Sequence, residues 1–217
     1  DAAVMHYGDK RTLVTTDLLL EGIHFNLEYA PLKHLGYKAA VVNFSDIYAM
    51  NATPTQITVS LGISKRFSVE DLEELYAGIR LACERYNVDL VGGDTSASMT
   101  GLTISITCLG TAYDSDIVYR NGAKVNDLIC VTGNLGTAYM GLQLLERERI
   151  VMQANEKATP AFDGREYLLE RQLKPEARRD IIEQLHKAGI KPTAMMDISD
   201  GLSSELMHIC TQSNVGC

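Results

Sequence analysis

The chain has 217 residues, of which 46% are hydrophobic, so it can bury a core as one large domain or two small ones. Its formal net charge of −8 and the absence of a basic stripe argue against a nucleic-acid partner. Its longest uncharged apolar stretch is too short to cross a bilayer, which argues against a membrane protein. Five cysteines without a CxxC pair indicate reduced thiols and a cytoplasmic location.

Hydrophobic periodicity in the first half predicts strands alternating with two helices. Asp46 falls on the first helix, in a stripe of apolar residues. Ser68 and Asp71 resemble a capping box at the start of the second helix. The expected elements are a strand at 11–16, a loop at 21–25, a helix from Pro31 to about Met50, a strand at 57–63, a helix from Ser68, a short strand at 88–91 that ends at Gly92-Gly93-Asp94, and a strand at 102–108.

The second half follows a polar, turn-rich stretch at 112–127, where we place a boundary between domains 1–118 and 119–217. Gly189 is a natural left-handed end for a helix. The expected elements are a strand at 128–132, a loop at Gly133–Gly136, a helix to about Arg149, a polar connector, a helix after Pro175, a strand at 194–197, and a final helix bearing Leu202, Leu206 and Ile209.

Six aspartates lie at the ends of apolar runs or beside small-residue turns: Asp1, Asp17, Asp46, Asp94, Asp197 and Asp200. Carboxylates beside apolar runs are costly unless a cation neutralises them, and no matching set of lysines or arginines adjoins them. Several divalent metal ions, most economically magnesium holding a polyphosphate, would explain the pattern. The aspartates therefore indicate ATP chemistry.

Each of these residues also has a purely structural interpretation. Asp17 and Asp94 could belong to turns, Asp46 could pair with a buried donor, and Ser199 or Asp200 could cap the last helix. Two further groups are equally open. Arg120 and Lys124 flank a glycine turn and are either phosphate contacts or surface cations, and His24 is either a phosphate contact or a structural histidine. Five element termini that all deliver carboxylates nevertheless favour a shared metal site.

The order of these motifs resembles that of the thiamine-monophosphate kinases, which belong to the aminoimidazole ribonucleotide synthetase-like superfamily. The most discriminating segment is TTDLLLEGIHF, because TTD followed by EG.HF separates these kinases from the related synthetases. The matching segments are DAAV at 1–4, TTDLLLEGIHF at 15–25, VNFSDIYAMNATP at 42–54, LVGGDT at 90–95, RNGAKVNDLICVTGNLG at 120–136 and MMDISDGLSSELMHI at 195–209. The resemblance spans nearly the whole chain.

The resemblance implies an α+β fold in which the first domain, 1–118, binds ATP and metal and pairs with a second copy to build a shared β-barrel. The second domain, 119–217, would be an incomplete α/β domain, because the family continues well beyond it. We therefore expect the sequence to be part of a longer chain. Asn51 stands where the family usually has glycine, and asparagine tolerates the left-handed backbone that such a turn needs.

The resemblance also implies the functional residues. His24 would lie near thiamine phosphate, and Gly93, Asp94, Arg120, Ser199 and Tyr76 would contact ATP. Several magnesium ions would be held by Asp1, Thr15, Thr16, Asp17, Asp46, Asp94, Asp197 and Asp200.

The implied reaction moves the ATP γ-phosphoryl onto thiamine monophosphate in line, giving thiamine diphosphate and ADP. The acceptor phosphate is already largely ionised at pH 7, so no general base is needed. The alternatives are another ATP-dependent synthetase of the same superfamily, or a non-catalytic module that binds divalent metal without nucleotide.

Overall fold

The computed structural model describes residues 1–155 and 157–217, which form one five-stranded sheet and six helices. The strands are β1 (Ala3–His6), β2 (Arg11–Leu20), β3 (Thr53–Ile63), β4 (Asp89–Ala97) and β5 (Leu102–Ala112). The helices are α1 (Leu32–Ala49), α2 (Val69–Tyr86), α3 (Thr137–Ala154), α4 (Glu166–Leu173), α5 (Arg179–Ala188) and α6 (Leu202–Ser213). The chain is therefore of mixed α and β structure, as the sequence predicts.

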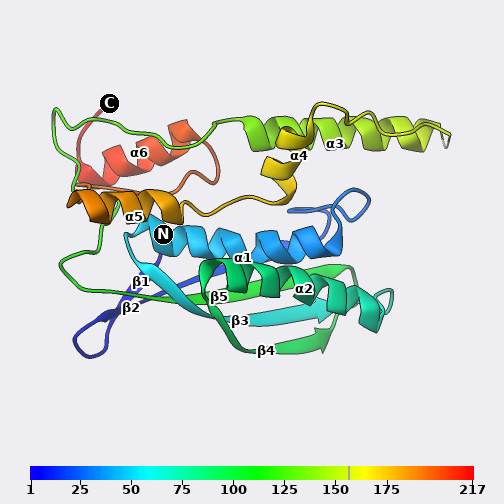
Figure 1. Cartoon of the computed structure of the whole chain (residues 1–217), viewed down its shortest axis with the longest axis horizontal. Coiled ribbons are helices and arrows are strands. Elements are labelled where there is room, and N and C mark those ends of the chain that lie inside the picture. Colours follow the sequence, from blue (N-terminus) through cyan, green and yellow to red (C-terminus); the bar gives the residue numbers. More distant parts are fainter. Residues whose placement is uncertain (156) are drawn as a thin grey trace.

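The sheet has the order β1-β2-β5-β3-β4, in which only β3 and β4 run parallel. Alternate residues of β5 are buried, including Ile104 and Ile106, so one face of the sheet forms the core. Helices α1 and α2 cover this face (Figure 1). The alternation that predicted β3 and β5 is confirmed, although both strands are longer than expected.

Helices α1 and α2 touch backbone to backbone. A Cβ atom built on Gly36 would lie 2.0 Å from the Leu75 carbonyl oxygen, and one on Gly78 would lie 1.9 Å from the Lys33 carbonyl oxygen. Only glycine allows this approach at either position. The close packing fixes α1 between the sheet on one side and α2 on another, and therefore sets the place of every side chain that α1 carries.

Three local signals read from the sequence are confirmed. The Ser68 side chain accepts a hydrogen bond from the Asp71 backbone N–H, and the Asp71 side chain accepts one from the Ser68 N–H. Gly189 ends α5 in the left-handed conformation, with φ of 66°. Asn51 adopts φ of 58°, and its side-chain amide donates a 2.8 Å hydrogen bond to the Asp116 carbonyl.

The predicted end of a strand at Gly92-Gly93-Asp94 is wrong. Strand β4 continues through all three residues to Ala97, because β3 offers it a pairing partner along the whole length from Gln56 to Ile63. The three residues are therefore part of the sheet edge and do not form a tight turn.

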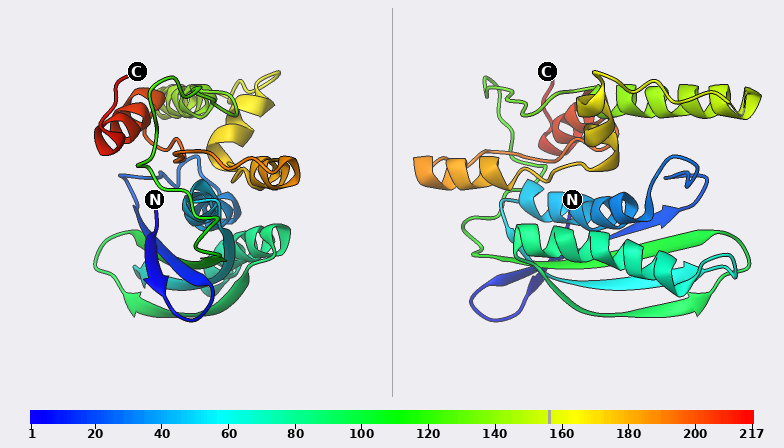
Figure 2. Two further views of the ribbon diagram at one scale, coloured as in Figure 1. Left: turned by 90° about the vertical axis from the view of Figure 1, so that its left-hand side faces the viewer. Right: turned by 45° about the vertical axis from the view of Figure 1, so that its right-hand side comes forward.

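The second half packs as helices beyond α1, on the side away from the sheet (Figures 1 and 2). The predicted strands at 128–132 and 194–197 are not formed, and the described residues after Ala112 contain no strand. A strand needs a continuous ladder of backbone partners, and the 194–197 segment has one such bond, from the Met195 N–H to the Tyr119 carbonyl at 3.1 Å. Helix α4 lies where the sequence indicated only a polar connector. None of the described helices is both long and apolar enough to span a membrane.

Candidate metal centre

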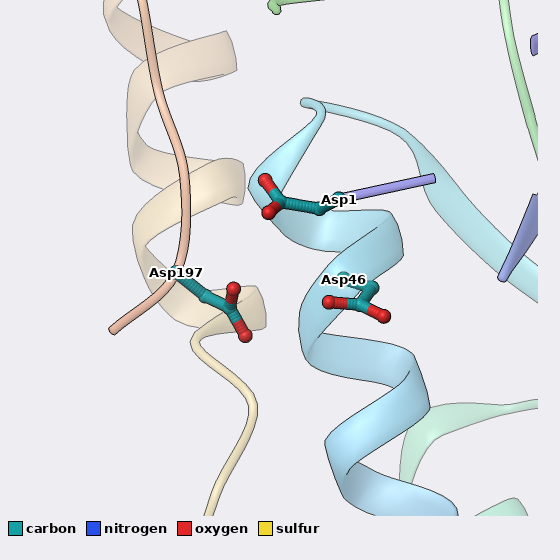
Figure 3. Close-up of side chains that lie close together, drawn as sticks. All are labelled: Asp1, Asp46 and Asp197. Carbon is teal, nitrogen blue, oxygen red and sulfur yellow. The ribbon is translucent and has the colours of Figure 1, made fainter. Parts of the chain in front are cut away.

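Three carboxylates from distant parts of the chain meet beside the C-terminal half of α1 (Figure 3). Asp46 lies on α1, Asp1 precedes β1, and Asp197 lies in the extended segment before α6. One oxygen from each of the three lies within 4.8 Å of the other two. We call this group the carboxylate cluster. Negative charges at this spacing repel one another in a partly buried site, so the cluster favours a compensating cation.

Asp46 is oriented by β2. The buried Thr15 hydroxyl donates a hydrogen bond to Asp46 Oδ2. Burial raises the pKa of Asp46 to about 6; the Thr15 hydrogen bond opposes this rise, while the charges of Asp197 and Asp17 add to it. The site therefore resists negative charge on Asp46 unless a cation is present.

Asp197 and Asp1 are each held by one neighbour. Ser45, next to Asp46 on α1, donates a hydrogen bond of 2.6 Å to Asp197 Oδ2. The Arg120 guanidinium forms an ion pair with Asp1 Oδ1. The second oxygen of Asp1 is buried and has no hydrogen-bond partner among the described residues. A buried oxygen of this kind is costly, and an external cation would satisfy it.

Asp17 adds a fourth carboxylate near the cluster. Its backbone N–H donates a 3.1 Å hydrogen bond to the Asn43 side chain, which is buried on α1. Burial raises the pKa of Asp17, the charge of Asp197 raises it further, and His24 has a smaller opposite effect. The negative charge of Asp197 is therefore felt at Asp17, although Asp17 is not one of the three carboxylates that meet in the cluster.

The donor set of this centre fits a hard divalent cation. The cluster supplies only carboxylate oxygens. Magnesium and calcium prefer such oxygen ligands, whereas softer metals prefer nitrogen or sulfur. The unpartnered oxygen of Asp1 and the raised pKa of Asp46 independently favour a positive charge at this place. The residues present are thus suited to hold magnesium.

The structure does not bring Asp94 and Gly93 to the cluster. Asp17 pairs with Ile106 on β5, and Ile106 pairs with Val59 on β3. Val59 pairs in turn with Gly93 on β4, so the four residues form one row across the sheet. Neighbouring strands lie about 4.8 Å apart, which puts Gly93 roughly 14 Å from Asp17. Within one chain, Asp94 is therefore too far away to contact an ion bound at the cluster.

Thr16 and Tyr76 also lie apart from the cluster's oxygens. The Thr16 hydroxyl donates a 3.2 Å hydrogen bond to the Ile106 carbonyl and accepts one from the Thr107 hydroxyl. Successive side chains of a strand point to opposite faces, so Thr16 points away from the face on which Thr15 meets Asp46. Tyr76 is half-buried on α2 and packs against the hydrophobic core.

Ser199 and Asp200 are exposed at the start of α6 and do not cap it. The N-cap residue is Gly201, and Glu205, inside the helix, has a buried carboxylate that accepts hydrogen bonds from the backbone N–H groups of Asp200 and Gly201. Sequence reasoning missed this role, although a glutamate four residues into a helix is a usable signal. Among the described residues, the side chains of Ser199 and Asp200 thus have no hydrogen-bond partner, and they lie a few residues beyond Asp197.

His24 lies at the mouth of a separate cleft of about 420 Å³, between the loop after β2 and helices α1, α3 and α4. Its Nδ1 accepts a 3.0 Å hydrogen bond from the Leu20 backbone N–H. The imidazole therefore has a structural partner, as one of the two interpretations of the sequence expected. Its Nε2 side is left for another contact.

Sequence reasoning also missed Ser45 and Asn43, which position Asp197 and Asp17. Both lie in the VNFSD segment that pointed to Asp46. Their side chains face different neighbours around α1, which could be foreseen only with the sheet and the 191–200 segment already in place.

A helix-covered mixed sheet that gathers carboxylates from the chain start, α1 and a distant loop defines a recognisable class. Residues 1–112 match AIR synthase related protein, N-terminal domain. This match covers more than half of the 217 residues, and the chain belongs to this family.

Within the family, the chain is similar to thiamine-monophosphate kinases. The enzyme from Aquifex aeolicus (strain VF5) is 36% identical over 215 residues, covering 99% of this chain and 65% of the relative. The enzyme from Bacillus subtilis (strain 168) is 32% identical over 203 residues, covering 94% and 60%. The structure of AaThiL complexed with AMPPCP and TMP superposes with a TM-score of 0.83 at 34% identity, covering 98% of this chain and 64% of that one. The chain thus spans less than two thirds of the length of these relatives.

Proposed function

We propose that the protein is a thiamine-monophosphate kinase, which transfers the ATP γ-phosphoryl to thiamine monophosphate and releases thiamine diphosphate and ADP. The observation that carries the proposal is the carboxylate cluster with its unpartnered Asp1 oxygen, on a chain similar to kinases of that name. The similarity to AaThiL, which was solved with AMPPCP and TMP, supports the same pair of substrates.

Asp1, Asp46 and Asp197 would hold magnesium, with Asp17 and the Thr15 hydroxyl beside them. Bound magnesium ions would neutralise the repulsion between the donor and acceptor phosphates. Thr16, Asp94 and Asp200 would serve further ions, and the strand register supports an ion at Asp94 that is distinct from one at the cluster.

The other residues would bind and orient the substrates. Arg120 already neutralises part of the cluster through Asp1, and it would exchange this partner for a phosphate oxygen of ATP. Gly93, Asp94, Ser199 and Tyr76 complete the proposed nucleotide contacts. His24, with one ring nitrogen tied to the Leu20 N–H, would present the other to the acceptor phosphate.

No side chain is required as a base, because the acceptor phosphate is largely ionised at neutral pH. The residues of the centre therefore act by holding charge and geometry. We further propose a cytoplasmic homodimer that acts without nucleic acid or membrane, with a first domain at 1–118 and a second at 119–217.

The proposal is tested by measuring thiamine diphosphate from ATP and thiamine monophosphate, together with magnesium-dependent binding of AMPPCP. We expect Asp46→Asn to abolish both magnesium-dependent signals. The control is Asp9→Asn, which changes an exposed aspartate in the turn before β2. AMPPCP binding that needs no magnesium, or that survives in Asp46→Asn, would remove the cluster from the proposed site.

A further inference from the structure

The last residue of α6, Ser213, is bonded to the turn at 120–123, which belongs to the segment that leads from β5 to α3 (Figures 1 and 2). The Ser213 hydroxyl oxygen accepts hydrogen bonds from the Gly122 and Ala123 backbone N–H groups, both at 3.1 Å. The same hydroxyl donates a 3.3 Å hydrogen bond to the Arg120 carbonyl. A serine hydroxyl has one donor and two acceptor sites, so this turn occupies all three.

The turn has little other support. In the described part of the chain, every hydrogen bond of the 120–123 backbone goes to Ser213. Asn121 and Gly122 are exposed, and Gly122 adopts φ of 131°, a conformation that favours glycine. A Cβ atom built on Gly122 would also lie 2.4 Å from the Thr193 carbonyl oxygen. The conformation of the turn therefore depends on Ser213 and on the close approach of Thr193.

The turn carries Arg120, whose side chain reaches the carboxylate cluster. The Arg120 Nε donates a 3.1 Å hydrogen bond to Asp1 Oδ1, and Nη2 forms an ion pair with the same oxygen. The Arg120 side chain is 31% exposed, whereas that of Asp1 is 2% exposed. Ser213 contacts the backbone of Arg120 and not its guanidinium, so any effect of Ser213 on the cluster acts through the position of Arg120.

The end of α6 does not need the Ser213 hydroxyl. Asn214 ends the helix in the left-handed conformation, with φ of 54°, and its N–H donates to the Thr211 carbonyl. The Val215 N–H donates a 3.0 Å hydrogen bond to the Cys210 carbonyl. Backbone bonds of this kind complete a left-handed helix end without a side chain. The hydroxyl therefore serves the turn and not the helix.

We propose that Ser213 is a positioning residue, which holds the 120–123 turn so that the Arg120 guanidinium meets a phosphate group of the nucleotide. This inference rests on the proposed function, in which Arg120 exchanges Asp1 for a phosphate oxygen of ATP. Because the backbone of Arg120 is already fixed, that exchange requires only rotation of the side chain. Without the hydroxyl, water can bond to the exposed turn, and nucleotide binding then has to remove the freedom that the turn gains.

The test is calorimetric titration of the chain with AMPPCP in magnesium. Ser213→Ala should weaken AMPPCP binding about threefold to tenfold, as expected when one more long side chain has to be ordered on binding. Thr211→Ala is the matched control, because it removes an exposed hydroxyl two residues earlier on α6, and it should bind like the wild type. Equal affinity in the two variants, with both folded by circular dichroism, would overturn the proposal. If Ser213→Ala does not fold, Ser213→Cys takes its place, because a thiol is a weaker hydrogen-bond partner.

A second background separates positioning of Arg120 from general stability. In Arg120→Met, the change Ser213→Ala should cause no further loss of AMPPCP affinity, because the side chain that Ser213 positions is gone. An equal loss in both backgrounds would overturn the proposal. Magnesium binding without nucleotide should not be weakened by Ser213→Ala. Weaker magnesium binding would indicate that α6 has loosened and displaced Asp197, and it would assign Ser213 a purely structural role.

The wild type distinguishes failure of this inference from failure of the proposed function. A wild type that does not bind AMPPCP in magnesium would overturn the proposed function and this inference with it. A wild type that binds AMPPCP, together with a folded Ser213→Ala variant of the same affinity, would overturn the role of Ser213 alone.

Discussion

At the scale of single residues, the negative charge of Asp46 lowers the stability of the folded chain, although the proposed magnesium binding needs that charge. Its pKa of about 6 exceeds the ordinary value of 3.8, mainly because the side chain is partly buried. Between about pH 4 and pH 6 the folded chain therefore keeps a proton that the unfolded chain has released. Stability must fall as the pH rises through this window, since the native state binds more protons.

We expect Asp46→Asn to raise the free energy of unfolding at pH 7 in EDTA by about 1–2 kcal/mol. A pKa shift of one unit corresponds to about 1.4 kcal/mol, and partial exposure of the carboxyl reduces the effect. Urea unfolding of both proteins at several pH values measures it. The gain should disappear near pH 4, where the wild-type carboxyl is protonated in the folded state.

Magnesium should stabilise the wild type at pH 7 and have little effect on Asp46→Asn, because a ligand stabilises only the state that binds it. Asp9→Asn serves as the control and should follow the wild type at every pH. A variant that is no more stable than the wild type in EDTA at pH 7 would show that burial does not penalise the Asp46 charge.

Ser45 provides a second prediction at this scale, because it supplies the 2.6 Å hydrogen bond that holds Asp197 against α1. We expect Ser45→Ala to weaken magnesium binding threefold to tenfold, which corresponds to the net value of one hydrogen bond, about 0.7–1.4 kcal/mol. Calorimetric titration with magnesium measures it. Ser203→Ala, an exposed serine on α6, should bind like the wild type. Unchanged affinity in Ser45→Ala would mean that Asp197 is held by other contacts.

At the scale of elements, Gly93 is the one residue of the Gly-Gly pair that the close approach of β4 to β3 requires. A Cβ atom on Gly93 would lie 1.9 Å from the Val59 carbonyl oxygen of β3, whereas one on Gly92 would meet nothing closer than 4.0 Å. We expect Gly93→Ala to lower the free energy of unfolding by about 2 kcal/mol or more, because β4 must move off β3. Gly92→Ala should change it by less than about 1 kcal/mol. Thermal melts of the two variants compare them directly, and equal melting temperatures would refute the close approach.

Some features of the helices and strands could be predicted from the sequence, and others could not. The capping box at Ser68, the left-handed Gly189 and the alternation of β5 are local signals, and each is found where predicted. The strands expected at 128–132 and 194–197 depend on partners that local periodicity does not reveal, and they are absent from the described residues. Helix α4 was missed because it is only eight residues long, which is too short for a clear helical period.

At the scale of the whole molecule, a shared metal site for six aspartates was predicted because they lie at the ends of apolar runs or beside small-residue turns. The structure brings three of them together, Asp1, Asp46 and Asp197. The position of Asp94 was not predictable in this way. It depends on the strand order, in which β5 and β3 lie between β2 and β4. A strand order of this kind is set by tertiary pairing, which spacing along the sequence does not encode.

The strand order also leaves β4 at an edge of the sheet, with β3 as its described partner and most of its residues exposed. An open edge of nine residues is a template for pairing with another chain, and Val91 on it is 52% exposed.

We therefore expect a homodimer that pairs through β4. We expect Val91→Lys to shift this homodimer towards monomer, because a charge on an edge strand opposes association. Light scattering at micromolar concentration measures the mass of both proteins. Val69→Lys, which places the same charge on the exposed start of α2, should remain dimeric. A wild-type mass of one chain would exclude the dimer, and a dimer that Val91→Lys leaves intact would place the interface away from β4.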